Sequence, residues 1–215
     1  MNTSDNRRWA LLGPLAVALW IAGVALINNN APGDHATGSE ILAWYRSHSD
    51  SITMGGWLFM LGCLGFVGFV AGLRVRLVEA AGQASQLPGL ALAGAAMAGV
   101  CGMLTAAVDL AGGIDKNDID PATAATFHHS TDIFFVGAEL AAVLPLAAVA
   151  VVAWRTRVLP RWWAAFTGLV ALVLVAGPIG WLGLIFGLPL WTLGTSLFVL
   201  LGSRARMRTA AAAAA

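Results

Sequence analysis

The segment Trp162–Leu201 reads WWAAFTGLVALVLVAGPIGWLGLIFGLPLWTLGTSLFVLL, 40 residues without a charged side chain. A membrane-spanning helix needs only about 20 apolar residues to cross a hydrocarbon core of about 30 Å, so this segment is too long for one span. The best break is Gly177–Gly180 (GPIG), because Pro lacks an amide donor and Gly tolerates positive φ. Gly187–Pro189 (GLP) is a second candidate. We therefore place two spans here, at 162–178 and 182–202.

The rest of the chain carries four more apolar runs of spanning length. Of its 215 residues, 59% are hydrophobic and 11% charged, with a mean hydropathy of +0.79. This composition excludes a disordered chain, a nucleic-acid-binding protein and a disulfide scaffold. It predicts an all-α, polytopic transmembrane bundle that forms a single membrane domain over residues 1–215. The additional spans are expected at 9–27, 52–73, 88–110 and 132–154.

The basic residues set the predicted topology. Cytoplasmic loops of membrane proteins are enriched in Lys and Arg, and ten of the twelve Lys and Arg residues flank one side of the predicted spans. This pattern places both termini in the cytoplasm, with 203–215 as a cytoplasmic tail, and therefore requires an even number of spans, six. The alternative is five spans with a re-entrant piece and an external C-terminus, and the tail arginines disfavour it. The ten residues are Arg7, Arg8, Arg74, Arg76, Arg155, Arg157, Arg161, Arg204, Arg206 and Arg208.

The first apolar run resembles a signal peptide in having basic residues before it, but its 19 residues exceed the usual core of about 7–15. The following Asn28–Pro32 lacks a small-x-small cleavage pattern, so we expect an uncleaved anchor. Tryptophan and tyrosine favour the two membrane interfaces. The expected inner belt is Trp9, Trp154, Trp162 and Trp163, and the expected outer belt is Trp44, Tyr45 and Trp57.

Small residues are frequent in two adjacent spans. Span 52–73 includes a Gly68–Gly72 pair, and span 88–110 is rich in Gly and Ala. Small residues let helices approach closely in lipid, so these two spans are expected to pack together as a hairpin. The sequence shows no clear internal repeat, which disfavours a transporter built from repeated halves.

Two outer loops contain helix-start signals. Thr37 and Glu40 fit a capping box, and the helix that follows, about 38–49, is expected to be a short amphipathic helix on the outer rim. In the second loop, Asp115 begins an acidic stretch, but a calcium-binding loop would need Gly at position six and Glu at twelve, and both are missing. Asp120–Pro121 instead predicts a capped helix start. That helix is expected to run unbroken to Trp154, about 51 Å.

Polar residues of two spans form the candidate site. His128, Asp132 and Glu139 recur at helical spacing on one face, and Glu139 lies within the apolar run, where a carboxylate is costly and is a functional candidate by default. Thr105 and Asp109 form a stripe on the preceding span. If these spans face each other, Asp109 and Asp132 meet near the rim, and Glu139 lies below them near Thr105. The expected result is an outward-facing polar pocket.

This pocket has several interpretations. It could bind a divalent metal through His128, His129 and Asp132, ligate haem, relay protons, or hold a polar ligand. Adjacent histidines point about 100° apart, so at most one faces any given site. The alternative is that these residues are polar groups at helix ends, wetted by the outer loops. Cys63 and Cys101 lack a paired motif and are expected to be inert core residues.

The sequence contains no His-Glu-x-x-His, Gly-x-Ser-x-Gly, phosphate-loop or Cys-x-x-Cys motif, which favours a non-enzymatic role without excluding an enzyme. The first hypothesis is a small binding, sensing or accessory subunit, with the lipid bilayer and other membrane subunits as partners and no nucleic acid. The second is a metal- or haem-binding redox or transport component. The third is a small proton-coupled transporter with Glu139 as the coupling site.

Several short stretches together resemble a known family. They are Pro32–Asp34 (PGD), Glu40–Tyr45 (EILAWY), Gly55–Trp57 (GGW), Asp120–Ala124 (DPATA) and Leu159–Trp162 (LPRW). Across most of the chain they resemble a family of small, uncharacterised actinobacterial-type integral membrane proteins with six predicted spans. The resemblance implies that topology and a plasma-membrane location. It implies no activity, and no site residues are carried over.

Overall fold

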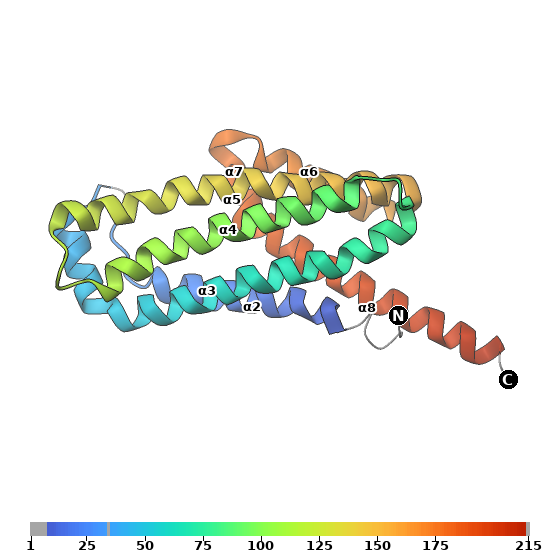
Figure 1. The fold of residues 1–215 in the computed structure, drawn as a ribbon, viewed down its shortest axis with the longest axis horizontal. Helices are drawn as coiled ribbons and strands as arrows, with labels where there is room; N and C mark the ends of the chain where they lie inside the picture. Colours follow the sequence, from blue (N-terminus) through green and yellow to red (C-terminus); the bar gives the residue numbers. More distant parts are fainter. Residues whose placement is uncertain (1–7, 34, 214–215) are drawn as a thin grey trace.

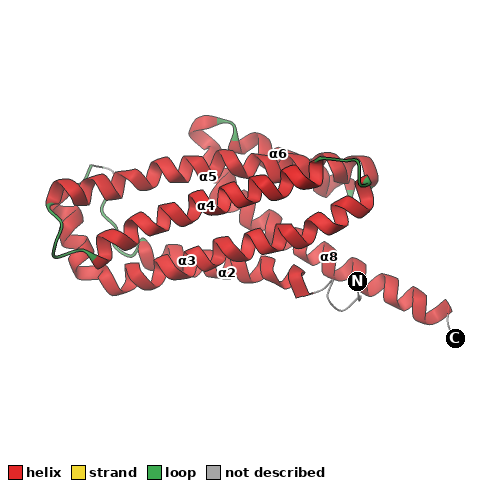
Figure 2. Ribbon diagram, in the orientation of Figure 1, coloured by secondary structure: helices red, strands yellow, loops and turns green. Residues whose placement is uncertain are grey.

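The computed structural model describes residues 8–33 and 35–213, with side chains up to residue 201. Every regular element in these ranges is helical, as predicted, and the helices pack along one long axis (Figures 1 and 2). In chain order they are η1 (Trp9–Leu11), α2 (Leu12–Ile27), α3 (Gly38–Ala81), α4 (Leu87–Ile114), α5 (Pro121–Thr156), α6 (Arg161–Leu174), η2 (Gly177–Ile179), α7 (Gly180–Leu182), the π-helix η3 (Gly183–Gly187) and α8 (Leu188–Ala213).

Five helical segments in the described ranges are long and apolar enough to cross a membrane: Trp9–Ile27, Gly38–Ala81, Leu87–Ile114, Pro121–Thr156 and Gly177–Leu201. The expected membrane protein is therefore confirmed at this level. The sixth apolar helix, α6, has only 14 residues. At about 1.5 Å per residue it is about 21 Å long, shorter than the hydrocarbon core.

Helix α3 corrects one prediction. Residues 38–49 do not form a separate amphipathic helix on the rim, because α3 continues through them for 44 residues. No Pro or Gly interrupts the chain between Ser39 and Met54, so the helix has no reason to stop. The predicted capping box at its start is confirmed: the Thr37 amide donates to Glu40 Oε2 at 2.7 Å, and the Glu40 amide donates to Thr37 Oγ1 at 3.4 Å. Hydrogen bonds from Thr37 hold the pKa of Glu40 below its ordinary value, and the bond from the backbone amide has a larger effect than the bond from the side chain.

Helix α5 confirms a second prediction. Asp120 caps it by accepting a hydrogen bond from the Thr123 amide at 2.7 Å, and Pro121 occupies the first turn. The helix then runs to Thr156 without a break, through Pro145 in its interior. Because α3 and α5 both extend far past the apolar core, their outer ends stand together beyond the shorter α2 (Figure 1).

The glycines of α3 face a different partner from the one expected. A Cβ at Gly62 would meet the Trp20 ring at 2.7 Å, and one at Gly72 would overlap the Trp9 ring, so this stripe packs on η1 and α2. The α3–α4 hairpin does form, but the close approach there comes from Gly99 and Gly102 of α4. The glycine pattern therefore marked a close helix contact and did not identify its partner.

The predicted break in the last apolar block is confirmed. Helix α6 ends at Leu174, and the chain turns through Gly177, whose φ of 61° is left-handed. The second candidate, Gly187–Pro189, does not turn, because η3 continues directly into α8 there. In Figure 1 the turn through Gly177 lies beside the middle of α5, not beside its end.

Charge separates the two ends of the bundle. The end at which α2 begins and toward which α8 extends in Figure 1 is named the arginine-rich end. Its described arginines are Arg8, Arg74, Arg76, Arg155, Arg157 and Arg161, whereas Arg7 and the side chains of Arg204, Arg206 and Arg208 lie outside the described residues. The opposite end, residues 28–33, 35–52 and 109–132, is named the cap.

The aromatic belts need correction. Trp57, Trp154 and Trp162 are more than half exposed, as interface residues should be. Trp44 and Tyr45, expected in the outer belt, are buried instead, and so is Trp163. The position of an aromatic residue near the end of a predicted span did not distinguish these buried rings from the exposed ones.

Candidate functional site

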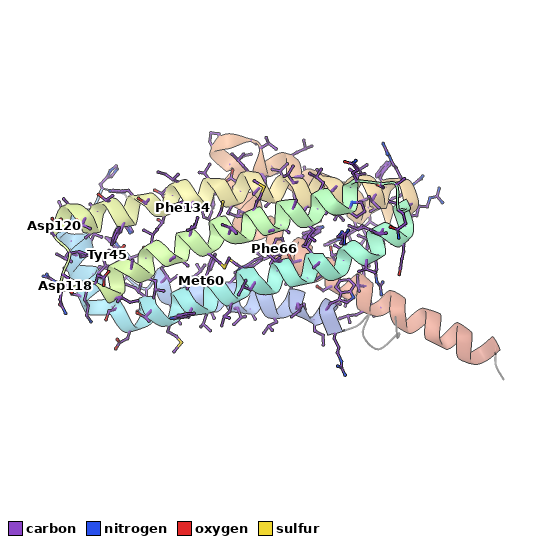
Figure 3. The ribbon with its side chains drawn as sticks, viewed as in Figure 1. Tyr45, Met60, Phe66, Asp118, Asp120 and Phe134 are labelled. Carbon is purple, nitrogen blue, oxygen red and sulfur yellow. The ribbon has the colours of Figure 1, made fainter. Side chains whose placement is uncertain are left out.

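The cap has a hydrophobic core of its own. Its buried members come from the first turns of α3, with Ala124 of α5, and loop residues pack around them. A helix that extends past the membrane must bury its apolar face against protein, because water borders it there. The core residues are Ile41, Leu42, Trp44, Tyr45, Ile52 and Ala124, with Ala31, Ala36, Ile119 and Ala125 against them. Figure 3 shows Tyr45 inward of Asp118 and Asp120, which lie at the tip.

Between this core and the end of α2 lies a cavity of about 220 Å³. The lining brings together the α2–α3 loop and helices α3, α4 and α5. Three of the five predicted pocket residues, Asp109, His128 and Asp132, line it, and so does His129. The complete lining is Asn28, Ala31, Pro32, Trp44, Asp109, His128, His129, Thr131 and Asp132.

Asp109 is the buried acid of this cavity, at 8% exposed. Its Oδ1 accepts a hydrogen bond from the Tyr45 hydroxyl at 3.2 Å, which fixes the carboxyl against the cap core. Helices α3 and α4 approach closely here because Gly112 has no side chain; a Cβ at that position would overlap the Tyr45 ring. Asp132 is exposed on α5 and close enough to interact electrostatically with Asp109. The predicted meeting of these two acids is therefore confirmed.

Trp44 forms the aromatic wall of the cavity. Its indole N–H donates to the Asn29 carbonyl at 3.1 Å, which ties the α2–α3 loop to α3. The His128 ring stands edge-on to it, with centroids 5.9 Å apart. The His48 ring, four residues along the same helix, has its centroid 6.4 Å from that of Trp44. The Trp44 ring is therefore held in one orientation by packing and by a hydrogen bond.

The basic groups of the cap are engaged away from the cavity. Lys116 Nζ donates to the Ser49 hydroxyl, and Arg46 Nε donates to the Lys116 carbonyl at 3.1 Å. Among the described residues that line the cavity there are two carboxylates and no Lys or Arg. With neutral histidines, the described lining is therefore anionic.

Glu139 and Thr105 lie elsewhere, which corrects the predicted pocket. Neither lines the cavity. Thr105 donates to the Cys101 carbonyl of its own helix at 3.1 Å. Glu139 is buried at 6% exposed and faces α7, where a Cβ on Gly180 would overlap Glu139 Oε1. One face of α5 therefore meets the cap at its outer turns and the α6–α8 turn farther down.

The metal interpretation lacks a ligand set in the described part of the chain. No group of three or more His, Cys, Asp or Glu side chains there is placed to hold a metal ion. His128 and His129 bring their ring centroids within 5.8 Å of each other, but His128 packs on Trp44 while His129 is exposed. The two rings diverge because consecutive helical side chains point about 100° apart.

Sequence reasoning did not find two features of this site. It placed Tyr45 in an interface belt, although Tyr45 holds Asp109, and it gave Asn28, Ala31 and Pro32 no role in the lining. The available signal was the position of Tyr45 on the apolar face of a capped helix that contains no breaker. No family model, curated protein or solved structure matches the chain.

Proposed function

We propose that the protein is a six-span integral protein of the plasma membrane, with both termini cytoplasmic, that binds a small organic cation from the outer side. The single observation that carries this proposal is the cap cavity, where two acids meet and no described Lys or Arg belongs to the lining. The arginines at the opposite end support the orientation through the positive-inside rule. This function makes the protein a binding or sensing subunit.

The lining favours an ammonium-type ligand. Two carboxylates close together repel each other, and a bound cation relieves this repulsion where burial strengthens electrostatic interactions. Aromatic rings also attract organic cations, and tryptophan does so most strongly. Asp109, Asp132 and Trp44 supply this combination on three different helices.

Size limits the ligand. Pockets for drug-sized ligands enclose about 300–1,000 Å³, and the cap cavity of about 220 Å³ is smaller. A ligand the size of choline or tetramethylammonium therefore suits it better than an extended molecule.

The test is calorimetric titration of the purified full-length protein in mild detergent with choline, tetramethylammonium and, as an anionic probe, acetate. We expect the two cations to bind and acetate not to bind. Asp109→Asn/Asp132→Asn should weaken cation binding at least tenfold. The matched control, Asp115→Asn/Asp118→Asn, removes the same charge from the same end outside the cavity and should bind as the wild type does. Equal loss in both double variants, or no binding by the wild type, overturns the proposal.

Zinc is included in the same titration because the metal hypothesis remains untested by experiment. Zinc binding that is lost in His128→Ala/His129→Ala, with no choline binding by the wild type, would favour a metal component. A visible absorption spectrum of the purified protein tests for haem. A haem band that is lost in His128→Ala/His129→Ala would favour a haem-binding component.

Glu139 favours a second candidate function, proton-coupled transport. It is a buried acid packed on an irregular turn, and broken helices often form transport sites. No Asp, Glu, Lys, Arg or His occurs in 80–108, 140–154 or 162–201, so these parts of the helices bring no counter-charge to it. A carboxyl in such surroundings is suited to carry a proton.

This candidate is tested in proteoliposomes that contain a pH-sensitive dye, with an imposed choline gradient. Proton flux that follows the gradient and is lost in Glu139→Gln supports transport. Glu79→Gln, at the arginine-rich end, is the matched control and should keep the flux. Choline binding without proton flux leaves the protein a binding subunit.

The family membership indicated by the short stretches, and an association with other membrane subunits, stay predictions. Co-purification of a stoichiometric second protein from a membrane extract would support the accessory-subunit form of the proposal.

A further inference from the structure

The arginine-rich end contains a second cavity, an open groove of about 380 Å³ between α5 and α6. Its wall is almost wholly apolar, and small side chains of α6 face the α5 wall. A Cβ at Gly168 would make an ordinary van der Waals contact with the Ala150 Cβ at 3.8 Å, so the gap between the two helices at this point is the size of a methyl group. The lining residues are Ala150, Val151, Trp154, Arg155, Ala164, Ala165 and Gly168.

Positive charge borders one end of this groove. Arg155 lines it, and the Arg161 guanidinium lies 5.9 Å from the centre of the Trp154 ring, another lining residue. Arg157 ends α5 in a left-handed conformation, so three arginines fall within the seven residues 155–161 that connect the two helices. No ion pair between a described carboxylate and Arg155 or Arg161 is present.

The groove runs from these arginines into the apolar part of the bundle. From Arg155 to Ala150 the helix rises about 8 Å, and the residues beyond Arg155 in the groove are uncharged. Exposed Trp154 and Trp162 place this level at a membrane interface. An occupant must therefore be anionic at the interface and apolar below it.

We propose that this groove binds one anionic phospholipid, with its phosphate at Arg155 and Arg161 and an acyl chain along Ala150, Ala165 and Gly168. Basic pockets between helices at the cytoplasmic interface recognise acidic head groups in this way. A second copy of the chain fits less well, because a two-fold contact through this groove would bring the two arginine clusters together. Charge complementarity therefore selects the lipid.

The test is native mass spectrometry of the full-length protein with phosphatidylglycerol or phosphatidylcholine of identical acyl chains. We expect one phosphatidylglycerol to remain bound, at least tenfold more than phosphatidylcholine at equal lipid concentration. Arg155→Ala/Arg161→Ala should abolish this preference. Arg8→Ala/Arg74→Ala removes the same charge from the same end of the bundle but outside the groove. This variant should keep the preference for phosphatidylglycerol.

Filling the groove tests the acyl-chain site separately. Ala165→Leu changes an exposed residue, so the fold should be retained, and it should reduce retained phosphatidylglycerol about as strongly as the arginine pair does. Equal loss in both arginine variants would show a general charge effect and overturn the proposal. So would undiminished retention of phosphatidylglycerol by Ala165→Leu, or a stable dimer that excludes lipid.

Discussion

At the cap, Trp44 is 5% exposed and its indole donates to a backbone carbonyl, whereas at the arginine-rich end Trp162 is 62% exposed. Both residues follow the same sequence pattern, an aromatic next to the end of an apolar run. The difference arises from what surrounds each end. The residues around Trp44 form a hydrophobic core in the cap, whereas Trp162 at the arginine-rich end lies on the outside of the bundle.

The same contrast applies to charge. The cap gathers carboxylates around a polar cavity, and the opposite end gathers arginines at the mouth of an apolar groove. Tryptophan is therefore a buried wall residue in one region and an exposed surface residue in the other. Paired substitutions at the two ends test this distinction directly.

The largest contrast is expected between Trp44→Ala and Trp162→Ala. Truncation of a buried aromatic costs about 3–5 kcal/mol because it removes packing and leaves a cavity. Trp44 also loses its bond to Asn29. Substitution of the exposed Trp162 should lower the free energy of unfolding by at most about 0.5 kcal/mol, as surface substitutions usually do. Unfolding by SDS titration in mixed micelles gives both free energies, and equal losses would contradict the assignment of Trp44 to a core.

A second contrast uses glycine. In Gly112→Ala the new methyl would lie 2.6 Å from Tyr45 Cε2, so the cap must open, and overpacking costs about 1–3 kcal/mol. Gly89→Ala has open space, and alanine should stabilise the helix by up to about 1 kcal/mol. The same titration measures both. If the two variants shift in the same direction, close packing of α3 on α4 is not the reason for Gly112.

Local signals predicted the regular part of the fold well. The Thr37 box, the Asp120–Pro121 start and the Gly177–Gly180 break each depend on a few neighbouring residues, and each lies where the sequence placed it. The partner of each helix was less predictable. The glycines of α3 indicated that another helix packs closely against it. They did not indicate whether that helix is α2 or α4, because this depends on the tertiary arrangement of the helices.

The candidate site was predicted in part for the same reason. Asp109 and Asp132 were expected to meet if spans 88–110 and 132–154 face each other, and they do share the cavity. Glu139 was assigned to the same site by helical spacing alone. Its neighbour, Gly180, is 41 positions away in an irregular turn, and no periodicity in α5 indicates that contact.

A smaller effect is expected from Tyr45→Phe, which keeps the packing of the ring and removes its hydroxyl. The bond from Tyr45 to Asp109 is lost, and a single hydrogen bond contributes about 1 kcal/mol. This is the chain's only tyrosine, so the substitution removes its only phenol hydroxyl. Choline binding should weaken together with stability. Unchanged stability would mean that Asp109 is held by other groups.

The smallest effect concerns the pH response of the α5 start. The Thr123 amide donates a hydrogen bond to Asp120. This bond is the largest of the effects that lower the pKa of Asp120 below its ordinary 3.8. The unfolded chain therefore binds this proton more readily than the folded one. The stabilisation is complete above the ordinary pKa and is lost as pH falls through the lower folded pKa.

Asp120→Asn isolates that contribution, because asparagine still accepts the capping bond but does not titrate. We expect the fall in melting temperature between pH 6 and pH 3 to be slightly smaller in Asp120→Asn than in the wild type. Asp118→Asn removes the same charge from the same loop without altering the cap, and should keep the wild-type slope. The effect is small because Asp120 is exposed and water screens its charge. An identical slope in all three proteins would mean that the ionisation of Asp120 does not contribute to the pH dependence of stability, and that the capping bond acts independently of the charge on this side chain.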